Sequence, residues 1–145
     1  MERNYEWGRA VSAKSAVAEK PRTILVADDD SQILELLGAM LEDLPVTVVQ
    51  ADNGLDAINL VTEKKPSLLI VDYQMPGWDG VAVCRHLKAD PTLTGVKVLL
   101  ITGVGTPPFL LEAVNHGLVD AALAKPFEVD EFVRLVMRLL ELPAR

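Results

Sequence analysis

The sequence has little cysteine, few aromatic residues and no long apolar run. Cys84 is the single cysteine among 145 residues and cannot form an internal disulfide, which favours a reducing compartment, and we expect the cytoplasm. No apolar stretch approaches the roughly 20 residues of a membrane-spanning helix, and the N-terminus lacks the apolar core of a signal peptide. The formal net charge is −7. Because no basic stripe is present, direct binding to nucleic acid is not expected.

What is present is typical of one soluble domain that buries an ordinary hydrophobic core. Half of the residues are hydrophobic and 24% are charged, and a chain of this length needs no disulfide or metal to fold. Residues 1–20 mix charge with alanine and serine, and we interpret them as a tail or linker ahead of a folded domain at 21–145. A short docking helix over 10–19, anchored by Tyr5 and Trp7, is the alternative.

Beyond Pro21, short apolar runs alternate with segments of helical spacing. This alternation is typical of an α/β fold with a parallel sheet covered by helices on both faces. Asp30 and Asp79 are expected to cap the helices that follow them. The pattern predicts strands at 23–27, 46–51, 68–71, 96–102 and 121–124. It predicts helices at 31–43, through Ala57 and Val61 to Lys65 after a turn at Asn53-Gly54, at 79–90, from near Pro107 to His116, and at 128–140.

Polar residues stand where four of these strands end. Asp28 and Asp29 follow the first strand, Asp72 the third, Thr102 the fourth and Lys125 the fifth. The carboxyl ends of parallel strands share one edge of the sheet, where ligands bind. Carboxylates gathered there would repel one another, which a magnesium ion and a lysine would relieve. An aspartate in such a site can act as a nucleophile toward phosphorus.

Each of these residues also has a plainer explanation when it is taken alone. The run from Asp28 to Asp30 could serve a turn and a helix cap, and Asp72 could be a turn residue. Thr102 alone is most often a strand-end residue, and Lys125 a solvated lysine. The four positions together, each at the end of a different strand, favour a phosphoryl-transfer site.

Five motifs in order resemble the receiver domain of two-component response regulators. They are "ILVADDD", "ADNGLDA", "LLIVDYQMPGWDG", "VLLITG" and "AKPF", and the resemblance extends over about residues 22–142. It implies a receiver domain at 21–145 with the doubly wound, flavodoxin-like fold, whose five-stranded parallel sheet has the order 2-1-3-4-5 and carries five helices.

The resemblance also implies residue roles. Asp72 would accept a phosphoryl group from the phosphohistidine of a sensor histidine kinase or phosphotransfer protein. Asp28 and Asp29 would hold Mg²⁺, together with Asp72 and the backbone carbonyl of Gln74. The chain would then not be a classical enzyme, since at most it would catalyse its own phosphorylation and dephosphorylation.

Thr102 and Lys125 would bind phosphoryl oxygens, and the Lys125–Pro126 bond is expected to be cis. Phosphorylation would reshape the face formed by the fourth helix, fifth strand and fifth helix, which an unknown downstream partner or output domain would recognise. We expect the loop at 103–108 to carry the signal. The resemblance leaves the oligomeric state open, with a homodimer as one option.

One position departs from the family pattern. The aromatic residue usual three positions before the lysine is replaced by Ala122, so no large side chain there can rotate inward. This supports the main alternative, a pseudo-receiver that binds proteins independently of phosphorylation. Gln74 and Val104 stand where family members tune hydrolysis, and they predict a long-lived phosphoryl state.

Two enzyme classes fit less well. A phosphatase with an aspartate nucleophile would need a D-x-D-x-T pattern after the first strand, and "DDDSQ" does not match it. A nucleotide-binding domain would need a G-x-G-x-x-G motif or a P-loop, and the sequence has neither.

Overall fold

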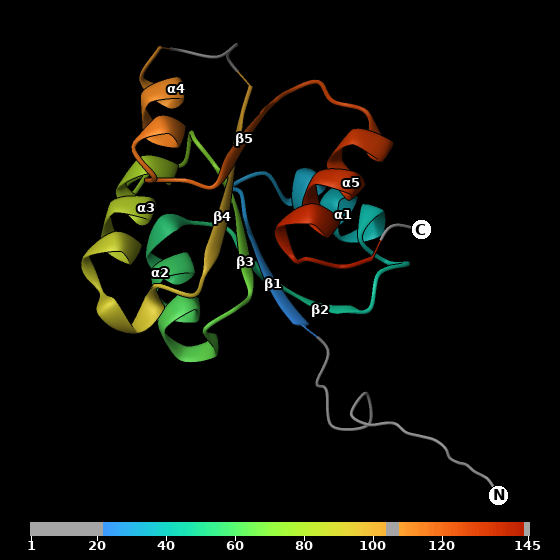
Figure 1. Cartoon of the computed structure of the whole chain (residues 1–145), viewed down its shortest axis with the longest axis horizontal. Coiled ribbons are helices and arrows are strands. Elements are labelled where there is room, and N and C mark those ends of the chain that lie inside the picture. The colour runs from blue at the N-terminus through green and yellow to red at the C-terminus, as the bar shows by residue number, and fades with distance from the viewer. Residues whose placement is uncertain (1–21, 104–107, 144–145) are drawn as a thin grey trace, which may run out of the picture.

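The computed structural model describes residues 22–103 and 108–143, with side chains at all of them except 109 and 110. The predicted tail, its docking-helix alternative, Val104 and most of the 103–108 loop lie outside these residues. The described chain alternates strands and helices as expected (Figure 1). The elements are β1 (Arg22–Ala27), α1 (Ser31–Met40), β2 (Val46–Ala51), α2 (Gly54–Lys64), β3 (Leu68–Asp72), α3 (Gly80–Ala89), the 3₁₀ helix η3 (Pro91–Leu93), β4 (Lys97–Thr102), α4 (Pro108–Asn115), β5 (Ala121–Ala124) and α5 (Val129–Leu139).

The five strands form one parallel sheet in the order β2-β1-β3-β4-β5, which confirms the predicted topology. Ala27 at the end of β1 lies beside Val71 in β3, and Thr102 at the end of β4 lies beside Ala124 in β5. The carboxyl ends of these four strands therefore share one edge. Among the helices of the described residues, none has the length and apolar character needed to cross a bilayer.

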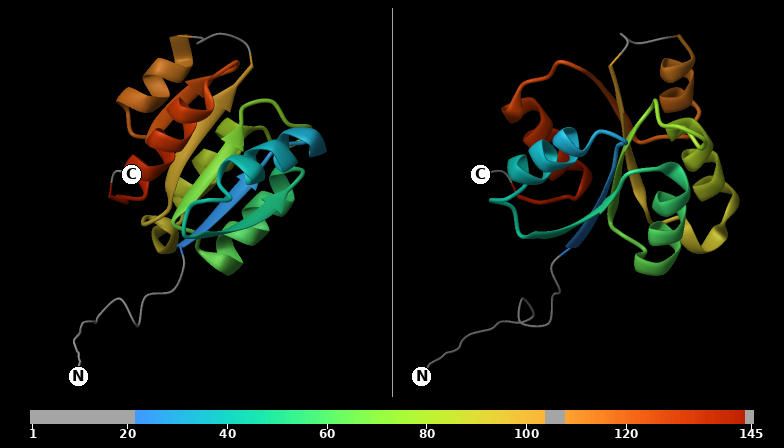
Figure 2. Two further views of the ribbon diagram at one scale, coloured as in Figure 1. Left: turned by 90° about the vertical axis from the view of Figure 1, so that its right-hand side faces the viewer. Right: turned by 180° about the vertical axis from the view of Figure 1, so that it is seen from behind.

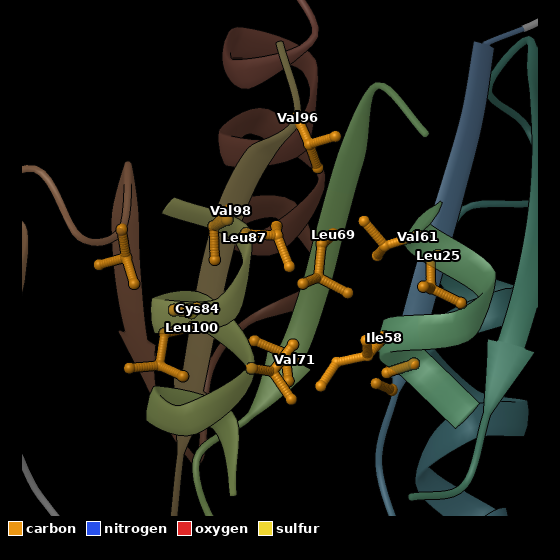
Figure 3. Close-up of a cluster of buried hydrophobic side chains, with 14 of the residues drawn as sticks. Leu25, Ile58, Val61, Leu69, Val71, Cys84, Leu87, Val96, Val98 and Leu100 are labelled. Atoms are coloured by element: carbon orange, nitrogen blue, oxygen red, sulfur yellow. The ribbon is translucent and has the colours of Figure 1, made fainter. Parts of the chain in front are cut away.

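Helices cover both faces of the sheet. The views in Figures 1 and 2 show α2, α3 and α4 on one side and α1 and α5 on the other. Successive residues of a strand point to opposite faces, so Leu25 joins the core beneath α2 and α3 whereas Ile24 and Val26 join the core beneath α1 and α5. Cys84 is buried in the first of these cores (Figure 3), where it packs as a small apolar residue.

The helix ends follow the local signals in the sequence. Asp30 accepts a hydrogen bond from the backbone nitrogen of Gln32 at 2.9 Å, and Asp79 accepts one from that of Ala82 at 2.8 Å, so both predicted caps are confirmed. Gly117 has a φ of 78°, and the backbone nitrogen of Leu118 bonds to the carbonyl of Ala113 at 2.8 Å. This is the Schellman arrangement, in which glycine ends a helix without strain.

Two local predictions need correction. The first helix ends at Met40 rather than at residue 43, and the chain turns through Leu41 to Leu44 ahead of Pro45. Both leucines are buried, so the apolar spacing that suggested helix continues through a turn. The 3₁₀ helix at Pro91–Leu93 was not predicted. It begins with Asp90 capping Thr92 and inserts Leu93 into the core.

Two glycines permit close approaches next to the acidic edge. A Cβ on Gly54 would lie 2.2 Å from the backbone oxygen of Trp78, and a Cβ on Gly80 would lie 2.5 Å from that of Asp72. Backbone atoms cannot move aside, whereas the end of a flexible side chain can. Glycine therefore lets α2 and α3 begin directly against the loop that follows β3.

We predict that Gly54→Ala lowers the free energy of unfolding by about 1–3 kcal/mol, because the loop at Trp78 must shift. Gly38→Ala is the matched control, since Gly38 lies inside α1 with its nearest neighbour, the Gln50 side chain, at 3.8 Å from the added carbon. This control substitution should raise the free energy of unfolding by about 0.5–1 kcal/mol, because alanine has a higher helix propensity than glycine. Urea unfolding measures both changes, and equal stability of the two variants would contradict the close-approach explanation.

Candidate functional site

Two buried aspartates meet at the carboxyl edge of the sheet. Asp28 follows β1 and Asp72 ends β3, and these strands are hydrogen-bonded neighbours. Only 3% of Asp28 and 8% of Asp72 is exposed. Asp29 is exposed beside them, and one carboxylate oxygen from each of the three acids lies within 4.8 Å of the others. The structure thus brings together the acids that the sequence predicts.

Lys125 reaches this cluster from the far side of β4. Its Nζ lies 3.6 Å from Oδ2 of Asp28 and 3.5 Å from Oδ1 of Asp72. Its backbone nitrogen donates to the carbonyl of Thr102 at 2.7 Å, and the Lys125–Pro126 bond is cis, as expected. A single ammonium group therefore bridges the two buried carboxylates.

Thr102 ends β4, between the strands that carry Asp72 and Lys125. It is almost fully buried, with 1% of its surface exposed. In the register of the sheet Asp72 lies beside Ile101, so Thr102 is one position further toward the edge. This places the hydroxyl-bearing residue next to the acids and the lysine.

A cavity of about 420 Å³ opens beside the cluster, bounded by Asp29 and the loop after β3. Gln74, the predicted source of a backbone ligand, contributes to its wall, whereas Val104 lies outside the described residues. Met75, Pro76 and Asp79 also line the cavity. The sequence pattern does not single out Met75. Its burial follows from the turn that brings the loop back against the core.

Burial, with repulsion from neighbouring acids, disfavours charge on both inner acids. Burial, followed by the negative charge of Asp28, raises the pKa of Asp72 from 3.8 to about 6, and Lys125 only partly offsets this. Burial also raises the pKa of Asp28, against the opposing effects of the hydrogen bond from the backbone of Asp30 and of Lys125. One ammonium group is therefore too little positive charge for this site.

The donor set fits a small hard cation. Magnesium prefers oxygen ligands and is commonly bound by one or two carboxylates that leave room for water and phosphate oxygens. Asp28, Asp29 and Asp72 supply carboxylate oxygens at suitable mutual distances, and the adjoining cavity leaves space for further ligands. A divalent ion would also neutralise the charge that Lys125 leaves unbalanced.

A second hollow lies on the other side of Thr102. It has a volume of about 320 Å³ and lies between α4 and β5, with Thr102, Ala122 and Leu123 on the sheet side and Leu111, Val114 and Asn115 on the helix side. Leu111 is 56% exposed. A larger residue than Ala122 would take up part of this space, so the departure from the family pattern has a counterpart in the structure.

The family follows from comparison with known sequences. Residues 24–137 match the family model of the response regulator receiver domain. The chain therefore belongs to the receiver domains of two-component signalling. Members of this family interact with histidine kinases or phosphotransfer proteins, and often with output domains.

Relatives and solved structures agree with this assignment. Sporulation initiation phosphotransferase F of Bacillus subtilis is 31% identical over 82% of this chain and 94% of its own length. The transcriptional regulator RpaA of Synechocystis is 33% identical, but the match spans only 48% of that longer protein. A crystal structure of a response regulator from Chloroflexus aurantiacus superposes with a TM-score of 0.76 at 31% identity, covering 84% of this chain and 99% of the other.

The raised pKa of Asp72 gives a pH dependence of known sign. Since the carboxyl has a higher pKa folded than unfolded, the folded state binds more protons between about pH 4 and pH 6. The free energy of unfolding of the metal-free protein should therefore fall as the pH rises through this window. Asp72→Asn should remove the share of this pH dependence that comes from Asp72. At neutral pH in EDTA it should raise the free energy of unfolding by about 1–3 kcal/mol.

Urea unfolding across this pH range measures the effect. Glu63→Gln is the matched control, since it removes one negative charge from an exposed position on α2. It should leave the pH dependence unchanged. A parent protein whose stability is insensitive to Asp72→Asn at every pH would disprove the raised pKa of Asp72.

Proposed function

We propose that this receiver domain is a phosphoacceptor whose Asp72 takes a phosphoryl group from a phosphohistidine on a sensor histidine kinase or phosphotransfer protein. The observation that carries the proposal is the bridging of Asp28 and Asp72 by Lys125, at 3.6 Å and 3.5 Å, beside an open cavity. A purely structural ion pair would not need two buried acids, a third acid at its mouth and access for a ligand.

The proposed reaction is an in-line displacement at phosphorus. A carboxylate oxygen of Asp72 forms the new P–O bond while the P–N bond to the donor imidazole breaks, and the imidazole leaves with the electron pair. Lys125 and Thr102 are assigned to the phosphoryl oxygens, which carry about −1.5 to −2 charge once transferred. Positioning and charge neutralisation are then the main contributions of the protein.

Asp28 and Asp29 are assigned to a magnesium ion, with Asp72 and the backbone carbonyl of Gln74. When bound, the ion supplies positive charge against the acids and the incoming phosphoryl oxygens. Asp72 must be ionised to attack, and its pKa of about 6 leaves it partly protonated at mildly acidic pH. Compensation of the neighbouring Asp28 charge therefore favours the nucleophilic form.

We assign the switch to the segment after Thr102 and to α4. Ala122 carries only a methyl group, which has no rotamer that could swing into the hollow beneath α4. We therefore infer that a change at Thr102 would be transmitted by movement of the backbone and of Leu111 and Val114 across this space. A two-state shift of this kind needs a free-energy difference of only a few kcal/mol.

The single cysteine supports a reducing location, and we assign the chain to the cytoplasm.

The alternative function is a pseudo-receiver that binds a partner without phosphorylation. Ala122 and the hollow beside it favour this alternative, because they remove one usual link between the site and the output face. The two functions differ in whether Asp72 accepts phosphorus.

Incubation with acetyl phosphate and Mg²⁺ should add one phosphoryl group to the parent chain, observed by intact mass. Asp72→Asn should abolish the addition, and Lys125→Ala should strongly reduce it. Asp52→Asn is the control, since this exposed acid lies outside the cluster and should label like the parent. Labelling that persists in Asp72→Asn would disprove the assigned acceptor, and an unlabelled parent would support the pseudo-receiver.

Beryllofluoride with Mg²⁺ should shift the methyl NMR signals of Leu111 and Val114, because both side chains line the hollow next to Thr102. The signals of Leu60, on α2 at the other end of the sheet, serve as the internal control. Asp72→Asn should abolish the response. Unchanged Leu111 and Val114 signals in a chain that does bind beryllofluoride would contradict a signal through α4.

A further inference from the structure

A long groove runs along α5 and is not used by the proposed phosphoryl chemistry. It has a volume of about 1200 Å³, and the end of α1, β5 and α5 line it. Apolar side chains on its walls include Met40, Leu44, Leu123, Val129, Leu135 and Leu142. Val129 is 49% exposed there, although it is a large hydrophobic residue. An apolar hollow of this size is typical of a surface that another segment or protein covers.

Residues 1–21, the N-terminal segment, precede Arg22 in the chain, and Arg22 lies close to this groove. Arg22, the first residue of β1, donates a side-chain hydrogen bond to the backbone carbonyl of Leu140 just beyond α5. Leu142, close by in sequence, lines the groove. An extended chain of 21 residues reaches about 70 Å at ~3.3 Å per residue, whereas the 11 residues of α5 span about 16 Å. The segment can therefore reach every part of the groove.

The composition of the N-terminal segment suits an apolar groove. The whole chain has only three Phe, two Trp and two Tyr, yet Tyr5 and Trp7 both lie in this segment. Segments that stay solvated are poor in aromatic residues, because nothing buries their rings. The segment also carries four basic and three acidic side chains, a net charge of +1, whereas residues 22–145 carry −8. Both the aromatic residues and the opposite net charges therefore favour attraction between the segment and the domain.

We propose that the N-terminal segment docks within its own chain into the groove along α5, with Trp7 as the apolar anchor. The groove can pair with both signs of charge in the segment: Asp130 and Glu131 face its basic side chains, and Arg134 and Arg138 in the same wall face its acidic ones. The groove and the hollow beside Thr102 share Ala122 and Leu123, so the docked segment would cover part of the face that the proposed switch alters. This last consequence alone rests on the proposed function. A partner that binds there would have to displace the segment.

The test uses the full chain with Trp78→Phe, which leaves Trp7 as its single tryptophan. Docking should protect Trp7 from acrylamide quenching and shift its emission to shorter wavelength than in the urea-unfolded chain. Val129→Asp and Leu135→Asp, placed in different turns of α5, should each reduce the protection. Leu55→Asp is the matched control, because it adds the same charge at an exposed leucine on α2, outside both the groove and the hollow beside Thr102. Circular dichroism checks that each variant folds.

Protection of Trp7 that is independent of protein concentration and sensitive to the groove variants supports docking within one chain. Protection that is lost on dilution would instead assign the groove to a second copy and overturn the proposal. A Trp7 as accessible as in the unfolded chain, or protection unaffected by both groove variants in folded protein, would also overturn it. None of these readouts depends on phosphorylation, so failure here and failure of the phosphoacceptor assignment are distinguishable.

Discussion

The burial of Asp28 and Asp72 next to each other is the constraint on which the site depends. The pairing of β1 with β3 holds these two carboxylates side by side, and burial strengthens every charge interaction between them. Lys125 bridges the pair but leaves the pKa of Asp72 near 6, so the isolated site is electrostatically unfavourable. Such a site gains most from an added cation, and perturbed acids in an open pocket are typical of functional sites.

Packing in the rest of the fold offsets the electrostatic cost of holding the two acids together. β3 is buried along its whole length, and each of its neighbours is tied to it in parallel register. Its side chains pack alternately into the two cores, so a shift of one residue would disrupt the packing on both faces. The acids therefore cannot separate without loss of core packing. The close approaches at Gly54 and Gly80 fix the adjoining loop in the same way.

Much of this architecture could be predicted because its signals are local. Most strands are apolar runs, α1, α2 and α3 each begin at an Asp or Asn cap, and Asp72, Thr102 and Lys125 stand directly where strands end. The end of α1 could not be predicted, since Leu41 and Leu44 keep helical spacing through a turn. The approach of Gly54 to Trp78 and the hollow beside Ala122 could not be predicted either. Both depend on how distant segments pack, which no local pattern records.

Small side chains on β5 account for both the hollow beside Thr102 and the groove along α5. This edge strand contributes three alanines and one leucine, so it presents little apolar volume to α4 on one face and to α5 on the other. Interiors are normally close-packed, and a shortage of volume leaves space that neighbouring elements must fill or share with a ligand. The hollow and the groove both include Ala122 and Leu123. A change on one side of β5 therefore alters the packing available on the other, which gives this edge the room that a signalling surface requires.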